Sequence, residues 1–169
     1  MAVPKLFVYD EKQCDPKKCT ARKMLRFGLA NELGSLKKIP HGAIVLNPFA
    51  KRAISSEDAE RAVLHGIVVM DLSWNNIEEF PKIRKDVAQR ALPLLFAANP
   101  VNWGKPQRLT SAEALGAALY IMGFRQEAKG IFEKFSWGEQ FLILNKEPLE
   151  RYAQAETSLG VVAIQEDYL

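Results

Sequence analysis

The sequence predicts an α/β fold with a mostly parallel sheet, and three observations support this class. Short apolar runs that are typical of buried strands alternate along the chain with amphipathic helical segments. The 169 residues suffice for one domain with a sizeable core, or for one domain with a small N-terminal lobe. Hydrophobic residues make up 48% of the chain and charged residues 25%, which is typical of globular proteins and excludes a disordered chain.

The first part of the chain is predicted to be a strand, a loop and a helix. Residues 5–9 are rich in β-forming side chains, and the acidic, proline-containing stretch 10–16 indicates a loop. A helix is expected over 20–33, with Thr20 as its N-cap and Gly34 at its end.

The middle of the chain alternates more regularly. Ser55 with Asp58 three residues later resembles a capping box, which predicts a helix running to about residue 65. Strands are predicted on either side of this helix, over 43–46 and 67–71, and a helix over 80–91 is followed by another buried apolar run over 92–98.

The last part of the chain is predicted to be mainly helical. An ordered loop over 99–108 precedes helices predicted over 112–122, 126–135, 139–144 and 148–155. Residues 156–169 are expected to form a tail with weak strand character at 161–164.

The carboxyl ends of parallel strands meet at one edge of a sheet, and this is where α/β proteins place their sites. The prediction therefore brings together the Asn47-Pro48 loop, the loop that begins at Asp71, and the loop over 99–111. Asp71 ends the strongest predicted strand and is the candidate functional carboxylate.

Several classes of site are excluded or disfavoured by the sequence. It contains no Gly-x-Gly-x-x-Gly after a strand, no Walker lysine loop and no nucleophile elbow. The two cysteines, Cys14 and Cys19, and the two histidines have no metal-binding spacing, so we expect no metal and two separate thiols. No apolar run suggests a signal peptide or a membrane span, so a cytoplasmic location is expected.

The net charge of +3 is too small to indicate a nucleic-acid partner, but cations are concentrated near the N-terminus. The cations Lys17, Lys18, Arg22, Lys23 and Arg26 in this region are candidates for binding a polyanion, and the family resemblance described below implies that it is RNA. The alternative is that they form an ordinary solvated helix face.

Three blocks of sequence together resemble one family. They are CDPKKCT over 14–20, VVMDLSW over 68–74, and LPLLFAANPVNWGKP over 92–106, the last followed by LTSAEALGAALYIMGF over 109–124. These blocks are similar to the ribosomal RNA aminocarboxypropyltransferases of small-subunit maturation, and the similarity covers about residues 3–155.

The resemblance implies a SPOUT-like knotted fold with a small N-terminal lobe. Residues 1–40 would be an RNA-binding lobe and 41–169 a catalytic domain that binds S-adenosylmethionine (SAM). The implied activity transfers the 3-amino-3-carboxypropyl group of SAM to a (N1-methyl)pseudouridine of small-subunit rRNA during ribosome biogenesis. The implied partner is this rRNA or the pre-ribosomal particle, with no membrane and no metal, and we expect a monomer.

The resemblance also implies the site residues. Those expected around SAM are Thr20, Leu46, Met70, Trp74, Leu92, Gln107 and Ser111, of which Met70, Leu92 and Gln107 would act through backbone groups. Asp71 is the candidate general base, because the attacking nitrogen must lose a proton. The alternative is that Asp71 only caps a turn or orients a loop.

Two other functions remain open at this point. A SPOUT-like RNA methyltransferase would share the fold and the cosubstrate but transfer a different carbon. A catalytically silent RNA-binding assembly factor would bind rRNA without turnover.

Overall fold

A five-stranded parallel sheet lies at the centre of the structure, a computed structural model that describes residues 2–10, 19–71, 80–106 and 108–169. The strand order is β2-β1-β4-β3-β5, and every pair is parallel. The strands are β1 (Leu6–Asp10), β2 (Asn31–Leu33), β3 (Ile44–Leu46), β4 (Ile67–Asp71) and β5 (Ala88–Arg90). The predicted α/β class with a parallel sheet is confirmed.

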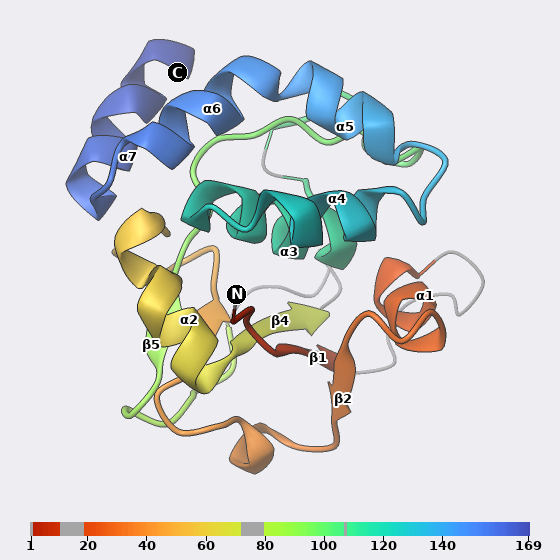
Figure 1. Cartoon of the computed structure of the whole chain (residues 1–169), viewed down its shortest axis with the longest axis vertical. Coiled ribbons are helices and arrows are strands. Elements are labelled where there is room, and N and C mark those ends of the chain that lie inside the picture. The colour runs from red at the N-terminus through yellow and green to blue at the C-terminus, as the bar shows by residue number, and fades with distance from the viewer. Residues whose placement is uncertain (1, 11–18, 72–79, 107) are drawn as a thin grey trace.

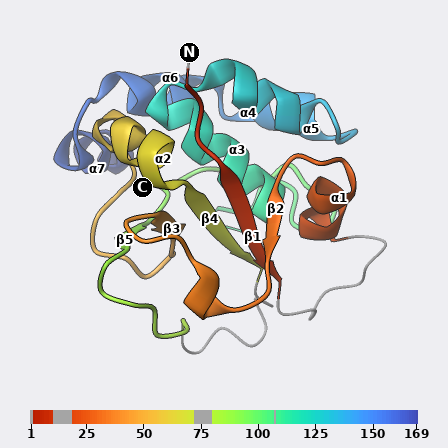
Figure 2. The same cartoon turned by 60° about the horizontal axis from the view of Figure 1, so that its bottom comes forward.

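The described part of the chain contains seven α-helices. They are α1 (Thr20–Arg26), α2 (Ala59–His65), α3 (Ser111–Met122), α4 (Arg125–Phe132), α5 (Gly138–Leu144), α6 (Lys146–Gln154) and α7 (Ser158–Gln165). Figures 1 and 2 both show α3 to α7 stacked on one side of the sheet, with α3 nearest to it.

Strand side chains alternate between two cores on the two faces of the sheet. Ile44, Ile67 and Val69 point into the larger core, where α3 contributes Leu115 and Leu119. The smaller core on the opposite face contains Val45, Val68 and Met70, with Leu33 and Ile39 from β2 and the segment after it. Burial on both faces explains why the central strands β3 and β4 are continuous apolar runs rather than alternating ones.

The helix predicted over 20–33 is wrong beyond Arg26. Gly28 has a φ of +70°, a left-handed conformation that ends a helix and suits glycine. The chain then returns as β2, which pairs with β1 and was not predicted. Cys19 is the N-cap of α1, so the prediction of Thr20 as the N-cap is also wrong.

The helix predicted over 80–91 is wrong, because β5 lies inside this range and residues 80–87 form no helix. The apolar residues Phe80, Ile83 and Val87 have helical spacing, but they pack on the smaller core. Arg84 holds this segment in place by donating hydrogen bonds to the carbonyls of Lys37 (2.8 Å) and Ile39 (2.5 Å).

The buried apolar run predicted over 92–98 is a buried loop, and its backbone is satisfied by side chains from α3, from α7 and from the residue between α5 and α6. Three alternate amides donate to such side chains: Leu94 to Gln165 Oε1 (2.8 Å), Phe96 to Asn145 Oδ1 (2.8 Å), and Ala98 to Glu113 Oε2 (2.7 Å). The hydroxyl of Tyr152 donates to the carbonyl of Leu94 (2.9 Å). The apolar run is therefore buried as predicted, but it pairs with no strand over its length.

The helices predicted after residue 110 are confirmed, with boundaries that differ by a few residues. Residues 158–165 form α7 instead of the predicted tail with strand character. Its N-cap is Thr157, whose side chain accepts a hydrogen bond from the amide of Gly160 (3.0 Å). In the described residues, no helix is long and apolar enough to cross a membrane.

The sheet extends through both predicted parts of the chain. Residues 1–40 contribute β1 and β2, and β1 lies between β2 and β4. The functional division at residue 40 stays a prediction, while the sheet itself is continuous across it.

Candidate active site

Two aspartates lie side by side at the carboxyl edge of the sheet. Asp10 ends β1, Asp71 ends β4, and they are register partners in the parallel pair, whose strands Figure 2 shows running in the same direction. The side chain of Asp10 is fully buried. Because adjacent strands are about 4.8 Å apart, two acidic groups share one small volume here.

The first turn of α3 closes this site. Ser111, the first residue of α3, lies with its Oγ 3.2 Å from Asp71 Oδ1 and donates a hydrogen bond to it. The helix N-terminus also directs its positive dipole end toward the carboxylate. Thr20 joins α1 to the same turn, because its Oγ1 accepts a hydrogen bond from the amide of Ala112 (3.2 Å). Cys19 Sγ lies 3.2 Å from Asp71 Oδ2.

The environment of Asp71 raises its pKa to about 6. Burial is the largest cause, and the negative charge of Asp10 adds to it, while the hydrogen bond from Ser111 acts in the opposite direction. A carboxylate with this pKa is mostly ionised at neutral pH and can still accept a proton readily. These are the properties of a general base.

Arg22 supplies the positive charge next to this pair. Its Nε lies 2.6 Å from Asp10 Oδ2, and its side chain is one-third exposed. The side chain of Arg22 therefore points toward the sheet edge. On the same helix, the side chain of Lys23 is half-buried and that of Arg26 is exposed. Lys17 and Lys18, predicted to bind RNA, lie outside the described residues.

The residues predicted around SAM follow the same edge of the sheet. Leu46 ends β3, Met70 precedes Asp71, and Leu92 comes two residues after β5. The side chains of Leu46 and Met70 point into opposite cores, so only their backbone groups lie along the same edge of the sheet. Since β3 lies between β4 and β5, these residues are spread along the edge over three neighbouring strands and the chain that follows them. Trp74 and Gln107 lie outside the described residues.

Comparison with known proteins identifies the family. A family model described as "Ribosome biogenesis protein, C-terminal" matches residues 44–169. The 16S rRNA aminocarboxypropyltransferase of Methanosarcina mazei is 47% identical over 166 residues, which cover 97% of this chain and 94% of the relative. The protein of the same name from Methanocaldococcus jannaschii is 45% identical over 169 residues, covering 100% of this chain and 98% of the relative.

The chain belongs to the 16S rRNA aminocarboxypropyltransferase family.

A solved structure agrees with this assignment. The SAM-dependent rRNA:acp-transferase Tsr3 from Vulcanisaeta distributa is similar to this chain with a TM-score of 0.85 and 37% sequence identity. The similarity covers 98% of this chain and 97% of that one. The aminocarboxypropyltransferase resemblance inferred from three sequence blocks is thus confirmed over nearly the whole length.

A second family model, described as "Possible Fer4-like domain in RNase L inhibitor, RLI", matches residues 4–36 of this chain. Iron–sulfur clusters of the ferredoxin type are held by four cysteine thiolates, and the whole chain has two cysteines. Cys19 is disulfide-bonded, so the expectation of separate thiols is wrong for this residue. Among the described residues, no group of three or more His, Cys, Asp or Glu side chains could hold a metal ion. The residues present do not fit such a cluster.

Two carboxylates at this edge were not singled out in the sequence. Asp10 directly follows the strand predicted over 5–9, a signal close to that of Asp71 at the end of its own strand. Glu113 is fully buried and accepts hydrogen bonds from Asn99 Nδ2 (2.7 Å) and from the amide of Thr110 (2.9 Å). The spacing of Thr110 and Glu113 is that of a capping box, which could have identified it.

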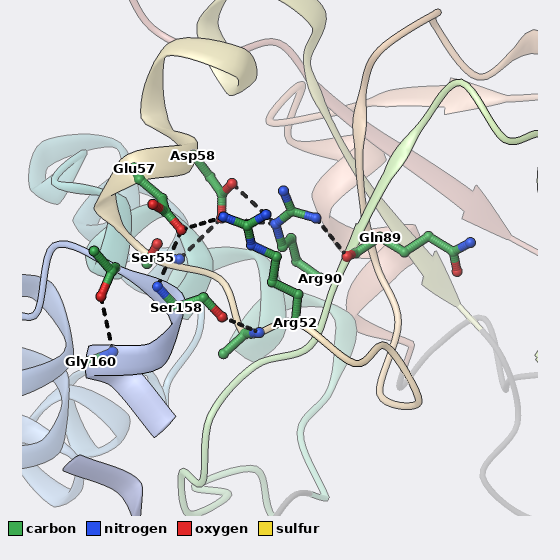
Figure 3. A network of polar contacts seen from close by, with 10 residues as sticks. Arg52, Ser55, Glu57, Asp58, Gln89, Arg90, Ser158 and Gly160 are labelled. Carbon is green, nitrogen blue, oxygen red and sulfur yellow. Dashed lines mark hydrogen bonds and ion pairs between the residues drawn. The ribbon is translucent and has the colours of Figure 1, made fainter. Parts of the chain in front are cut away.

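Arginine pairs support the other end of the same edge (Figure 3). Arg90, at the end of β5, lies with its Nε 3.1 Å from Asp58 Oδ1, and Arg52 pairs with Glu57 at 2.7 Å. Glu57 also accepts a hydrogen bond from the amide of Ser158 (3.3 Å), and this contact joins the start of α7 to the loop after β3. These contacts hold the end of β5, which leads to Leu92.

Proposed function

We propose that this protein transfers the 3-amino-3-carboxypropyl group of SAM to a (N1-methyl)pseudouridine of small-subunit rRNA during ribosome biogenesis. The observation that carries the proposal is the similarity to 16S rRNA aminocarboxypropyltransferases, which spans nearly the full length of both chains. The SAM dependence named for the Vulcanisaeta distributa relative supports SAM as the cosubstrate.

The edge of the sheet suits a cationic, elongated cosubstrate. SAM carries a positive sulfonium, and the two carboxylates of Asp10 and Asp71 favour a nearby cation. We place Leu46, Met70 and Leu92 along the length of the ligand, with Thr20 and Ser111 at the end near Asp71. Trp74 and Gln107 complete the proposed set.

Asp71 acts as the general base in this proposal. A nucleobase nitrogen forms a bond to the γ-carbon of the methionyl chain, the bond between that carbon and sulfur breaks, and the neutral thioether leaves. The proton of the nitrogen goes to Asp71. Ser111 holds the carboxylate through Oδ1, which restricts its orientation toward the nitrogen. When bound, SAM supplies the electrophilic carbon.

The proposed RNA-binding surface begins on α1. Lys23 and Arg26 extend the basic segment that includes Lys17 and Lys18, and cationic side chains neutralise phosphates. Arg22 belongs to the same helix but also pairs with Asp10, so it would connect the RNA surface to the catalytic carboxylates.

Further properties belong to the same proposal. The fold is proposed to be SPOUT-like and knotted, with an RNA-binding lobe over residues 1–40 and a SAM-binding domain over 41–169. The protein is proposed to be a cytoplasmic monomer that acts on the pre-ribosomal particle, without a metal and without a membrane.

Two parallel labelling reactions test the activity. The protein is incubated with small-subunit rRNA that contains the (N1-methyl)pseudouridine without an aminocarboxypropyl group, and with SAM labelled either in the carboxyl carbon or in the methyl group. We expect the carboxyl label to enter the RNA and the methyl label to stay out of it.

The other outcomes identify the alternatives. Transfer of the methyl label alone would mean a methyltransferase. Absence of both labels from the RNA, with rRNA binding intact, would mean a silent assembly factor.

A further inference from the structure

Trp103 lies at the tip of a loop that folds back on itself. Phe96 forms an antiparallel bridge with Pro106, and the amide of Ala97 donates to the carbonyl of Lys105 (3.0 Å). Gly104 has a φ of +73°, which allows the tight turn next to Trp103. The backbone around Trp103 is therefore closed by its own hydrogen bonds.

The base of this loop is fixed to α3. Asn99 Oδ1 accepts a hydrogen bond from the amide of Asn102 (2.9 Å), and Asn99 Nδ2 donates to the buried Glu113. Glu113 is on the first turn of α3, two residues after Ser111, which contacts Asp71. Since Trp103 is four residues from Asn99, the chain holds its Cα within about 14 Å of that of Asn99.

Exposure and charge make the loop tip an unusual surface. The side chain of Trp103 is 55% exposed and that of Val101 is 75% exposed. Lys105 and Arg108 are exposed next to them, and the sequence from 99 to 112 contains no acidic residue. An exposed indole close in sequence to two exposed cations combines the two features that bind unpaired nucleotides, a stacking surface and phosphate neutralisation.

We propose that Trp103 is a stacking platform for an unpaired nucleobase of the substrate rRNA, with Lys105 neutralising an adjacent phosphate. The proposal rests on the proposed function for the identity of the RNA. A nucleotide that reacts beside Asp71 must leave its base stack, so its neighbour loses a stacking partner. Trp103 replaces that partner and fixes the RNA relative to α3.

The test compares Trp103→Ala and Trp103→Phe with the wild-type chain in filter binding to unmodified small-subunit rRNA. We expect Trp103→Ala to weaken RNA binding about tenfold or more, because base–aromatic stacking contributes this much. Trp103→Phe keeps an aromatic face and should stay within about threefold of the wild type. Leu159→Ala, which truncates another exposed apolar side chain on α7, is the matched control and should leave RNA binding unchanged.

Salt dependence separates stacking from charge. Trp103→Ala should leave the slope of log affinity against log salt unchanged, whereas Lys105→Ala should reduce it by about one phosphate contact. SAM affinity, measured by calorimetry, should be the same for all variants.

Three results would overturn the proposal. They are RNA binding by Trp103→Ala within twofold of the wild type, a loss of SAM affinity in that variant, or weaker binding to pre-ribosomal particles with unchanged binding to naked rRNA. Failure of the proposed function would look different, because the carboxyl label would then stay out of the RNA even with the wild-type chain.

Discussion

At the scale of single residues, the chemistry depends on how Asp71 is surrounded. Burial and the neighbouring Asp10 raise its pKa, while Ser111 donates a hydrogen bond to the ionised form. Arg22 pairs with Asp10, and its positive charge offsets the repulsion between the two adjacent carboxylates. The proton affinity of Asp71 is thus set by three residues from three different elements.

Asp71→Asn should lower the rate of carboxyl-label transfer by roughly 100-fold or more, because an amide cannot accept the proton. In the wild type, the rate should rise about tenfold from pH 5 to pH 7, since the ionised fraction of a group with a pKa of about 6 increases by that factor. Initial rates at saturating SAM and rRNA measure both effects. A wild-type rate that does not vary over this range would show that Asp71 is not the base.

Asp71 should also make the free energy of unfolding depend on pH, in the direction opposite to its effect on the rate. The pKa of Asp71 is raised from 3.8 to about 6 in the folded chain. Its favourable contribution to the free energy of unfolding is therefore complete below about pH 4 and is lost as pH rises through 6. The free energy of unfolding of Asp71→Asn, relative to wild type, should therefore increase between pH 4 and pH 8. Urea unfolding at both pH values measures this difference, and a constant difference would contradict the assigned pKa.

At the scale of elements, α3 organises the site more than any strand does. Its first turn contacts Asp71 through Ser111 and α1 through the amide of Ala112. The same turn fixes the loop after residue 96 through Glu113. The helix is also packed very closely on α4, because a Cβ at Gly116 would lie 2.5 Å from the Phe132 ring.

Glu113→Ala should destabilise the fold by about 3–5 kcal/mol, because three donors would be left without an acceptor in a buried place. These donors are the amides of Ala98 and Thr110 and the Asn99 side chain. Urea unfolding measures the loss. The exposed Glu133→Ala is the control, with a change within about 0.5 kcal/mol; equal effects of the two substitutions would refute the role of Glu113.

The elements that the sequence predicted correctly are those with local signals. Strands β1, β3 and β4 are short apolar runs between turn residues, and α3 begins with a capping box. Residues 80–91 have helical spacing, yet Arg84 finds its carbonyl partners more than 40 residues away. A local pattern cannot contain such distant partners, so the helix prediction failed there.

The site was predictable to a similar extent. The edge of the sheet and Asp71 follow from the predicted parallel sheet and from the place of Asp71 at a strand end, whereas the choice of residues around SAM came from the family resemblance. The ion pair of Arg22 with Asp10 joins residues of different elements, and no spacing rule indicates it. The side-chain partners of residues 94–98 lie 15 to 71 residues away, so the sequence indicates only that this apolar run is buried.

At the scale of the whole molecule, the N-terminal part belongs to the sheet. β1 pairs with β4 over five register positions and with β2 on its other side. Removing residues 1–40 would take away both strands and α1, and it would expose the edge of β4. Val8, Ala21 and Met24, all fully buried, would be lost from the larger core.

A fragment of residues 41–169 should therefore fail to fold as a compact unit. We expect it to lack near-ultraviolet circular dichroism and a cooperative urea transition, both of which the full chain should show. The full chain under the same conditions is the control. A fragment that unfolds cooperatively and binds SAM would support an independent domain from residue 41 onward.

The hydrogen bond from the amide of Leu94 to Gln165 affects when the site can be completed during protein synthesis. Ribosomes release the chain from its N-terminus, so both aspartates and the whole sheet emerge long before α7. Until residue 165 has emerged, the segment that follows Leu92 lacks one of its backbone partners. The order of translation thus leaves the end of the candidate site near Leu92 incomplete until α7 has been synthesised.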